Sequence, residues 1–323
     1  MTEVILRAEK LCKRFRLADN SELIAVDQMD LSLYRGEVLG LVGESGSGKS
    51  TLGRLLSGLT DKSSGQVYLS EQQQPQRFTR KDFQRQAKQL QMVFQDPMAS
   101  LNPRMTVAEI LAEPLVLQSA KVTRALLLAW LDKVNLPVQA LDRYPHEFSG
   151  GQRQRLGIAR ALIAEPKILI CDEPISALDV SVQAQIVNLL SALRASMGLS
   201  ILFIAHDLSM VRYISDRIAV MYRGQLMELA SSNTLFNNAR HPYTQLLLAS
   251  NPIADPQQER QRMLDAASIK KMVSEPQQHQ ESRESSGCSF AGRCPKTLQC
   301  CFGERPSLKN YADGHKLACH AME

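Results

Sequence analysis

The sequence predicts a mixed α/β fold, in which a largely parallel sheet is interrupted by an inserted helical region. Three short apolar runs, EVLGLV (37–42), KILIC (167–171) and SILFIA (200–205), each lead into a segment with helix-like spacing. Strands this apolar are typical of parallel sheets that are buried on both faces. Between about residues 97 and 165 the stretches TVAEILAEPLVL and TRALLLAWLDKVNL are helix-patterned, with no strand-like run between them. This region is expected to be a helical insertion.

Length and composition limit the class of protein. A chain of 323 residues suggests about two domains, and 44% apolar residues are enough for a buried core. The net charge of +5 is small and does not demand a nucleic-acid partner. No apolar run approaches the roughly 18 to 20 residues that cross a bilayer, and the start MTEVILRAEKLCKRF lacks the apolar block of a signal peptide. We therefore expect a cytosolic protein.

Cysteine placement divides the chain. Five of the seven cysteines lie after residue 287, and they follow a polar stretch, SEPQQHQESRESSG (274–287), that reads as a linker. We therefore predict a main domain over 1–250, a connector over 251–286 and a small Cys-rich element over 287–323.

A glycine-rich segment follows the first apolar run. GESGSGKST (43–51) fits the phosphate-loop pattern G-x-x-x-x-G-K-[ST], with a predicted strand before it and a helix after it. Gly43, Gly46 and Gly48 allow tight backbone conformations, so that N–H groups can surround an anion. Lys49 would supply a positive charge at the phosphates, and Ser50 a hydroxyl ligand for Mg²⁺. The alternative reading is a flexible Gly/Ser turn.

Two acids end the second apolar run, in ILICDEP (168–174). In open α/β sheets the carboxyl ends of the strands carry the ligands, so Asp172 would hold Mg²⁺ and Glu173 would orient or deprotonate the attacking water. The pair could instead cap the next helix. Gln95 and His206 also end apolar runs and suit a γ-phosphate site, although either residue, taken alone, is more often structural.

A second anion-attracting element lies in FSGGQRQRLGIARAL (148–162). Ser149 can cap a helix whose first turn contains Gly150 and Gly151, and a helix N-terminus attracts phosphate. One phosphate loop with two phosphate-attracting elements suggests a head-to-tail pair, in which the SGGQ helix of each chain closes over the nucleotide of the other. The alternative is an ordinary Ser-capped helix.

Taken in order, GESGSGKS, Gln95, FSGGQ, ILICDE, SALD (176–179) and His206 resemble the nucleotide-binding subunits of ABC transporters over roughly residues 3–250. The resemblance implies a mostly parallel sheet with flanking helices and an antiparallel edge, an ATPase activity, and ATP with Mg²⁺ as ligands. It also implies that Gln95 joins Ser50 and Asp172 around Mg²⁺, that Asp179 lies in a loop crossing the dimer interface, and that Phe15 stacks on adenine. The residues it assigns to nucleotide binding are Phe15, Gly43, Glu44, Ser45, Gly46, Ser47, Gly48, Lys49, Ser50, Thr51, Ser149, Gly150, Gly151, Gln152 and Asp179.

Within that family, QDPMASLNPRMTV (95–107), EPISALDVSVQAQI (173–186), RHPYTQLLL (240–248) and the Cys-rich tail resemble the ATPases of dipeptide, oligopeptide, nickel and opine importers. The resemblance implies two transmembrane permeases, an extracytoplasmic solute-binding protein, a second and often different ATPase, and peripheral attachment at the cytoplasmic face of the inner membrane. SLNPR lies where the family contacts its membrane subunits. The alternative is a soluble ABC ATPase acting on nucleic acid or ribosomes. Such proteins usually carry a coiled-coil insertion or two cassettes in one chain, and this chain has neither.

The tail, GCSFAGRCPKTLQCC…GHKLACH (287–320), is too short for a core of its own, which suggests a metal staple. Its cysteine spacing differs from the C-x₂-C pairs of zinc ribbons. By resemblance, Cys288, Cys294, Cys301 and Cys319 would hold a 4Fe–4S cluster; Zn²⁺ and free or oxidised thiols are the alternatives. Cys300 could exchange with Cys301, and His315 and His320 are conceivable substitute ligands.

Overall fold

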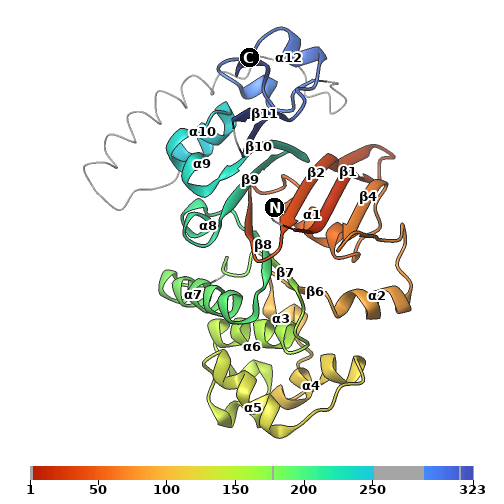
Figure 1. The fold of residues 1–323 in the computed structure, drawn as a ribbon, viewed down its shortest axis with the longest axis vertical. Coiled ribbons are helices and arrows are strands. Elements are labelled where there is room, and N and C mark those ends of the chain that lie inside the picture. Colours follow the sequence, from red (N-terminus) through yellow and green to blue (C-terminus); the bar gives the residue numbers. More distant parts are fainter. Residues whose placement is uncertain (1–2, 177, 251–286, 313, 323) are drawn as a thin grey trace, which may run out of the picture.

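The computed structural model describes residues 3–176, 178–250, 287–312 and 314–322. Its centre is an eight-stranded mixed sheet from which helices project on both sides (Figure 1). The strands of this sheet are, in spatial order, β11 (Lys309–Ala312), β12 (His315–Leu317), β10 (Gln225–Ser231), β9 (Arg217–Tyr222), β3 (Val38–Val42), β8 (Ser200–Ile204), β7 (Ile168–Asp172) and β6 (Leu90–Val93).

The five strands from β9 to β6 run parallel, whereas β10, β12 and β11 continue the sheet in antiparallel pairs. This confirms the predicted largely parallel sheet with an antiparallel edge. The three apolar runs form β3, β7 and β8, and every residue of these strands is buried. Successive side chains of a strand point to opposite faces, so each face contributes to a different core. Leu39 and Leu41 belong to one hydrophobic cluster, and Val38 and Val42 to the other.

A four-stranded antiparallel sheet covers one face, with α1 packed between it and the central sheet. Its strands are β2 (Glu22–Tyr34), β1 (Val4–Arg16), β4 (Ser64–Leu69) and β5 (Gln72–Gln73). Among the described residues, the helices outside the inserted region are α1 (Lys49–Leu56), α2 (Arg80–Ala87), α7 (Val180–Met197), α8 (Leu208–Ile214), α9 (Ser232–Asn238), α10 (Pro242–Ala249) and α12 (Cys300–Gly303).

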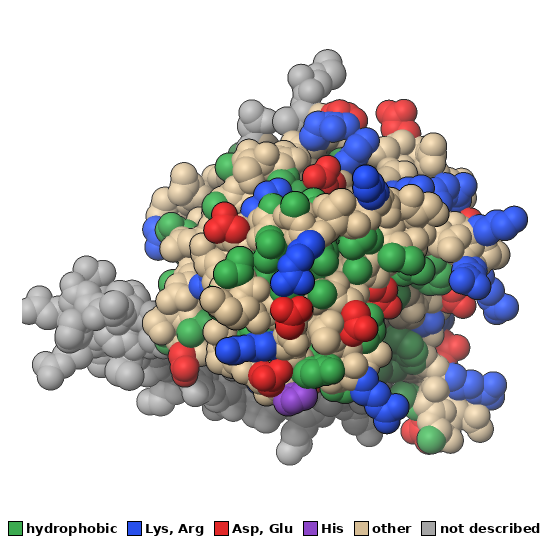
Figure 2. Space-filling view, turned by 90° about the horizontal axis from the view of Figure 1, so that it is seen from below, with side chains coloured by type: hydrophobic (Ala, Val, Ile, Leu, Met, Phe, Trp, Pro, Cys, Tyr) green, Lys and Arg blue, Asp and Glu red, His purple; other side chains and the backbone are tan. Residues whose placement is uncertain are grey.

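The inserted region is helical throughout its regular elements, as the sequence predicts. It contains α3 (Pro97–Ser100), α4 (Val107–Leu117), α5 (Arg124–Lys133), the 3-10 turns η1 (Val138–Asp142) and η2 (Pro145–Glu147), and α6 (Gly150–Leu162). Thr106 starts α4 through a capping box with Glu109, and Trp130 of α5 is 1% exposed. Figure 2 looks onto this end of the molecule, where hydrophobic side chains are interspersed with charged ones. No helix of the described residues is long and apolar enough to cross a membrane.

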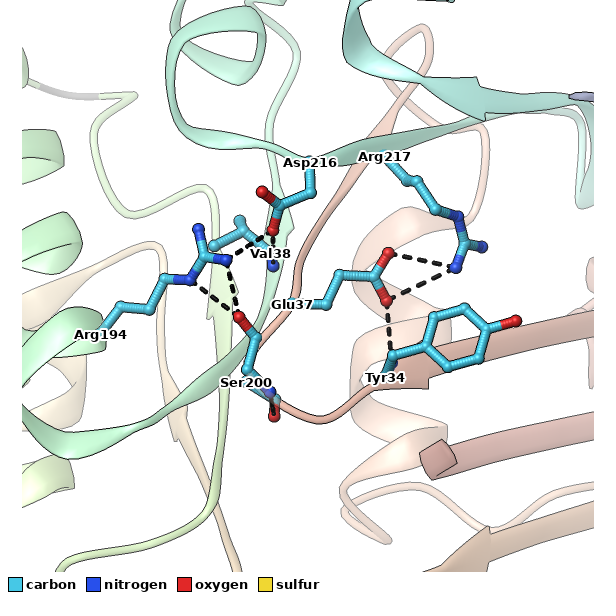
Figure 3. A network of polar contacts seen from close by, with 8 residues as sticks. Tyr34, Glu37, Val38, Arg194, Ser200, Asp216 and Arg217 are labelled. Carbon is cyan, nitrogen blue, oxygen red and sulfur yellow. Dashed lines mark hydrogen bonds and ion pairs between the residues drawn. The ribbon is translucent and has the colours of Figure 1, made fainter. Parts of the chain in front are cut away.

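Polar contacts secure the start of β3, at the opposite end from the glycine-rich loop (Figure 3). Asp216 accepts a hydrogen bond from the Val38 N–H at 2.8 Å and pairs with Arg194 at 2.7 Å. Glu37 pairs with Arg217 at 3.1 Å, and burial raises the pKa of its carboxyl group. These contacts fix the strand whose other end positions the loop.

The Cys-rich element joins the main sheet directly. β12 pairs with β10 at Glu228↔Leu317, and the 3-10 turn η3 (Ala291–Arg293) carries Phe290 at its start into the core, 1% exposed. In Figure 1 this blue segment lies beside β10. A second 3-10 turn, η4 (His320–Met322), ends the described chain. The predicted connector, 251–286, lies outside the described residues, so the domain boundaries stay a prediction.

Candidate functional site

The glycine-rich loop joins β3 to α1 at the carboxyl edge of the sheet. Gly43, Gly46 and Gly48 have φ values of 155°, 77° and 100°. A Cβ added at Gly48 would lie 2.0 Å from the Ala25 carbonyl oxygen, so only glycine fits there. Gly48 then starts α1 in the left-handed conformation.

Lys49 occupies the centre of this loop and is 4% exposed. Its Nζ donates to the carbonyl oxygens of Gly43 at 2.8 Å and Glu44 at 2.9 Å, which holds the ammonium group inside the curve of the loop. Burial lowers the pKa of Lys49, while the carboxylates of Glu173 and Asp172 oppose that shift. A desolvated cation in this position would bind an anion strongly.

Ser50 and Asp172 meet across the loop, although 122 residues separate them in sequence. The Ser50 hydroxyl donates to Asp172 Oδ1 at 2.7 Å, because α1 and the end of β7 converge at the same edge of the sheet. Burial raises the pKa of the Asp172 carboxyl group, and the hydrogen bond from Ser50 opposes that shift. A hydroxyl and a carboxylate side by side fit the oxygen ligands that Mg²⁺ prefers.

Glu173 is the meeting point of the candidate catalytic residues. Gln95 Nε2 donates to Glu173 Oε2 at 3.0 Å, and His206 Nδ1 lies 3.6 Å from the same oxygen. Glu173 has φ 46°, a left-handed conformation that is uncommon for a non-glycine residue, while its N–H donates to the Ile204 carbonyl oxygen. The structure therefore brings together the three residues that the sequence suggested separately.

Lys49, Ser50, Gln95 and Glu173 line one open cleft of about 740 Å³. Asp172 and His206 are not among its lining residues, but they adjoin it through Ser50 and Glu173. The expected residues Gly43, Glu44 and Ser47 do not line it either. Phe15, 37% exposed, lies in the cleft wall, and Lys13 Nζ sits 4.9 Å from its ring centroid. The expected residues in the cleft lining are Phe15, Ser45, Gly46, Gly48, Lys49, Ser50, Thr51, Gln95 and Glu173. Sequence reasoning missed Arg223 and Gln225 from the β9–β10 hairpin, and Gly287 and Ser289 from the tail. No local motif marks them, because the fold of distant segments brings them to the cleft.

The SGGQ segment lies elsewhere. Ser149 caps α6 through a capping box, in which its Oγ accepts from the Gln152 N–H and its own N–H donates to Gln152 Oε1 at 3.0 Å. Gly150 and Gly151 form the first turn, and a Cβ on Gly151 would meet Val182 of α7 at 2.5 Å. None of these four residues is among those lining the cleft. Asp179 precedes α7 as its N-cap residue, without a side-chain capping bond.

The cysteines of the tail lie within electrostatic reach of one another. Burial, and to a smaller extent the neighbouring thiols of Cys301, Cys294 and Cys319, raise the pKa of Cys288 to about 11. The Cys288 N–H donates to the Cys301 carbonyl oxygen at 2.8 Å. Cys301 is buried and interacts electrostatically with Cys288, Cys294 and Cys319, whereas Cys300 is exposed.

Both histidines of the tail are engaged away from these thiols. His315 Nε2 lies 2.8 Å from Glu228 Oε1 in a buried pair, and His320 Nε2 lies 3.0 Å from the Glu304 carbonyl oxygen. Among the described residues, no three His, Cys, Asp or Glu side chains are grouped closely enough to hold a single metal ion.

Comparison with known protein families gives two matches. Residues 26–176 match the ABC transporter family, and residues 227–301 match the C-terminal region of oligopeptide/dipeptide transporters. The first match spans the glycine-rich loop, SGGQ and the acid pair. The second extends from the antiparallel edge of the sheet into the tail.

Relatives match over nearly the whole chain. The chain is 44% identical to the oligopeptide transport ATP-binding protein OppF of Haemophilus influenzae, over 98% of this chain and 97% of the relative. It is 47% identical to the putative oligopeptide transport ATP-binding protein YkfD of Bacillus subtilis, over 98% and 95%. A solved dimeric ATP-binding cassette bound to ADP and Pi superposes with a TM-score of 0.65 at 26% identity, over 71% of this chain and 99% of that one. The chain therefore belongs to the ABC transporter ATP-binding subunits of the oligopeptide/dipeptide type.

Proposed function

We propose that this chain hydrolyses ATP in the cleft between the glycine-rich loop and Glu173 and thereby drives an importer of oligopeptides. The observation that carries the proposal is one cleft lined by Lys49, Ser50, Gln95 and Glu173. Asp172 accepts a hydrogen bond from Ser50, and His206 lies 3.6 Å from Glu173. The peptide cargo rests on the names of the relatives, which are oligopeptide transport ATP-binding proteins.

Each group has a role that its position supports. Lys49 and the backbone N–H groups of the loop bind the β- and γ-phosphates, and Phe15 stacks on the base. Ser50, Asp172 and Gln95 hold Mg²⁺, which neutralises charge on the phosphates. Glu173 accepts the proton of the attacking water, while Gln95 and His206 keep its carboxylate aimed at the γ-phosphate.

Lys49→Ala tests the cleft. We expect MgATP affinity to fall at least about tenfold, because a charge-assisted hydrogen bond to phosphate contributes roughly 1.5 to 3 kcal/mol. Lys62→Ala is the matched control: Lys62 is also buried, but it donates to the carbonyl oxygens of Gln74 and Pro75 outside the cleft. Isothermal titration calorimetry on both full-length variants makes the comparison. Equal affinity of Lys49→Ala and wild type would exclude the cleft as the ATP site.

The active unit is a head-to-tail pair. Ser149, Gly150 and Gly151 do not line the cleft of their own chain, and Ser149 already satisfies the start of α6 by its capping box. The similar solved cassette bound to ADP and Pi is dimeric. A second ATPase subunit, a copy or a relative, would bring its SGGQ segment and Asp179 to this cleft.

Light scattering of the Glu173→Gln chain with MgATP tests the pairing, because blocked hydrolysis should trap the closed pair. We expect the mass to double on adding MgATP, and Ser149→Glu in the same background to prevent the change by placing a carboxylate against the γ-phosphate. A chain that binds MgATP and stays monomeric would contradict a homodimer, and the same measurement with a related ATPase then tests the heterodimer.

An apolar groove offers a place for the membrane partner. It has a volume of about 350 Å³ and lies between α2 and α4, where Phe83, Phe94, Pro114 and Leu117 contribute to its walls. We propose that a cytoplasmic helix of a transmembrane permease occupies it, which attaches the chain to the inner face of the membrane. The SLNPR segment (100–104) precedes α4 directly. Leu117→Lys should abolish co-purification with the permeases while leaving MgATP affinity unchanged.

The tail is proposed to hold a 4Fe–4S cluster through Cys288, Cys294, Cys301 and Cys319. The electrostatic interactions among these four thiols support this, and thiolates are the ligands that such a cluster takes. The cluster would supply a cross-link between segments of the tail. Anaerobic purification should yield a brown protein with iron and sulfide; one zinc per chain without iron would establish the alternative metal.

A further inference from the structure

A tail residue reaches into the glycine-rich loop. Arg293 Nη1 and Nη2 donate to the two carboxylate oxygens of Glu44 at 2.9 and 3.0 Å, a bidentate pair across 249 residues of sequence. Nη1 also donates to the Tyr222 hydroxyl at 3.2 Å, and the guanidinium lies 5.6 Å from the Tyr222 ring centroid. Three hydrogen bonds and a cation–π contact orient this one side chain.

Glu44 is tied to the loop on its other side. Its carbonyl oxygen accepts the Lys49 ammonium at 2.9 Å, and its N–H donates to the Tyr243 hydroxyl at 2.9 Å. Tyr243 is buried and packs 5.3 Å from the Phe290 ring, centroid to centroid. The outer side of the loop is therefore held by the tail and by the helix α10 on which the tail packs.

The charge of Glu44 conflicts with the ligand of the loop. The Glu44 carboxylate acts electrostatically on the Lys49 ammonium, so an unpaired Glu44 would compete with a bound triphosphate for that cation. The Arg293 guanidinium neutralises that carboxylate while leaving Lys49 available to the phosphates.

We propose that Arg293 is a positioning residue of the ATP site. It neutralises Glu44 and fixes the glycine-rich loop, and through it the ligation of the tail thiols affects the affinity for ATP. The proposal rests on the proposed function of the cleft. Arg293 ends the 3-10 turn η3, and Cys294 follows it directly. The Cys294 N–H donates to the Ala291 carbonyl oxygen inside the same turn. A change at the Cys294 thiol would therefore act on the same turn that positions Arg293.

MgATP affinity of full-length variants, measured by isothermal titration calorimetry, tests the charge role. Arg293→Gln should weaken MgATP binding about three- to tenfold, since the pair is bidentate but partly exposed. Glu44→Gln added to Arg293→Gln should restore the affinity to within about twofold of wild type, because the unpaired carboxylate is then gone. A purely structural role predicts that the double variant binds as weakly as Arg293→Gln or worse.

The matched control is Arg35→Gln. Arg35 also forms a bidentate pair, donating to the two carboxylate oxygens of Glu3 at 2.6 and 2.8 Å, and neither residue lines the cleft. We expect it to change MgATP affinity less than twofold. Wild-type affinity in Arg293→Gln, or failure of Glu44→Gln to recover binding, would overturn the proposal. If wild type itself fails to bind MgATP, the proposed function falls instead.

Cys294→Ser tests the link to the cysteine element. It should weaken MgATP binding in the wild-type background and have no further effect in Arg293→Gln, while iron or zinc content falls equally in both. Additive losses of affinity would show that the cysteine element does not act through Arg293.

Discussion

Residues of the proposed ATP cleft extend from the ends of buried parallel strands, whereas the C-terminal element is attached to the body by the pairing of β12 with β10 and by side-chain contacts. β3 and β7 are fully buried and lead directly into the glycine-rich loop and the Asp172–Glu173 pair. The tail depends on Phe290 in an aromatic cluster, on the His315–Glu228 pair and on the Arg293 and Arg305 ion pairs.

This difference separates the expected effects of mutation. The buried strands hold the cleft in place independently of the polar side chains that line it. Substituting those side chains should therefore change ATP binding or hydrolysis and leave the free energy of unfolding nearly unchanged. The buried contacts of the tail attach it to the body, so removing one should mainly lower the free energy of unfolding.

Glu173→Gln should lower ATP turnover by about 10³-fold, which lies within the range for loss of a general base, and leave MgATP affinity and the melting temperature close to wild type. The glutamine side chain keeps the size and the contact with Gln95 but cannot accept the proton. Steady-state hydrolysis and thermal unfolding of the same preparation make the test. Normal turnover would exclude Glu173 as the general base. A large fall in melting temperature would contradict the expectation that side chains lining the cleft contribute little to stability.

Phe290→Ala should lower the free energy of unfolding by about 3 kcal/mol, because the ring is 1% exposed and packs against Tyr222 and Tyr243. Phe302→Ala, in the same element but 43% exposed, is the control and should cost less than about 0.5 kcal/mol. Denaturant unfolding compares the two. Equal losses would mean that Phe290 does not anchor the tail.

The stability of the chain should fall as pH falls from about 6.5 to about 4, partly because of His241. Burial lowers the pKa of His241 to about 4, against 6.5 in the unfolded chain. In that window the unfolded state binds the extra proton, so this group contributes a slope of up to about 1.4 kcal/mol per pH unit. Its contribution is fully present above pH 6.5.

His241→Asn isolates this group. The asparagine oxygen can replace the His241 Nδ1 that caps α10 by accepting from the Tyr243 N–H, but it does not titrate. Unfolding free energies measured between pH 4 and 7 should therefore show a shallower slope in the variant. An unchanged slope would contradict a buried neutral His241.

Cys300→Ser should have the smallest effect, with a change below about 0.5 kcal/mol and no change in metal content, because Cys300 is exposed. Cys301→Ser, one residue along, should lose both the proposed cluster and stability, since Cys301 is buried and interacts electrostatically with Cys288, Cys294 and Cys319. Iron, sulfide and zinc analysis of the two variants decides between them. If only Cys300→Ser lost the metal, Cys300 and not Cys301 would be the ligand.

Most of the fold could be predicted from local patterns. The apolar runs correspond to β3, β7 and β8, the helix-patterned stretch corresponds to α3–α6, and Ser149 caps α6. These features depend on alternation, period and capping, which neighbouring residues determine. Gln95, Glu173 and His206 could be proposed as one group only because strand ends in a parallel sheet meet at one edge.

The contributions of the tail could not be predicted. Ser289 enters the cleft and Arg293 pairs with Glu44 because β12 adds to β10, a pairing between residues about 90 apart in sequence that no local pattern encodes. The same is true of His315, which looks like a spare ligand in sequence and is paired with Glu228 in a buried contact. Such features depend on tertiary packing.

A crystal structure of the Glu173→Gln chain with MgATP tests the central claim most directly. We predict a triphosphate bound by Lys49 and the loop N–H groups, a metal between Ser50 and Asp172, and, if the chain pairs with itself, Ser149 of a second copy at the γ-phosphate. A triphosphate bound outside this cleft would contradict ATP hydrolysis at this site.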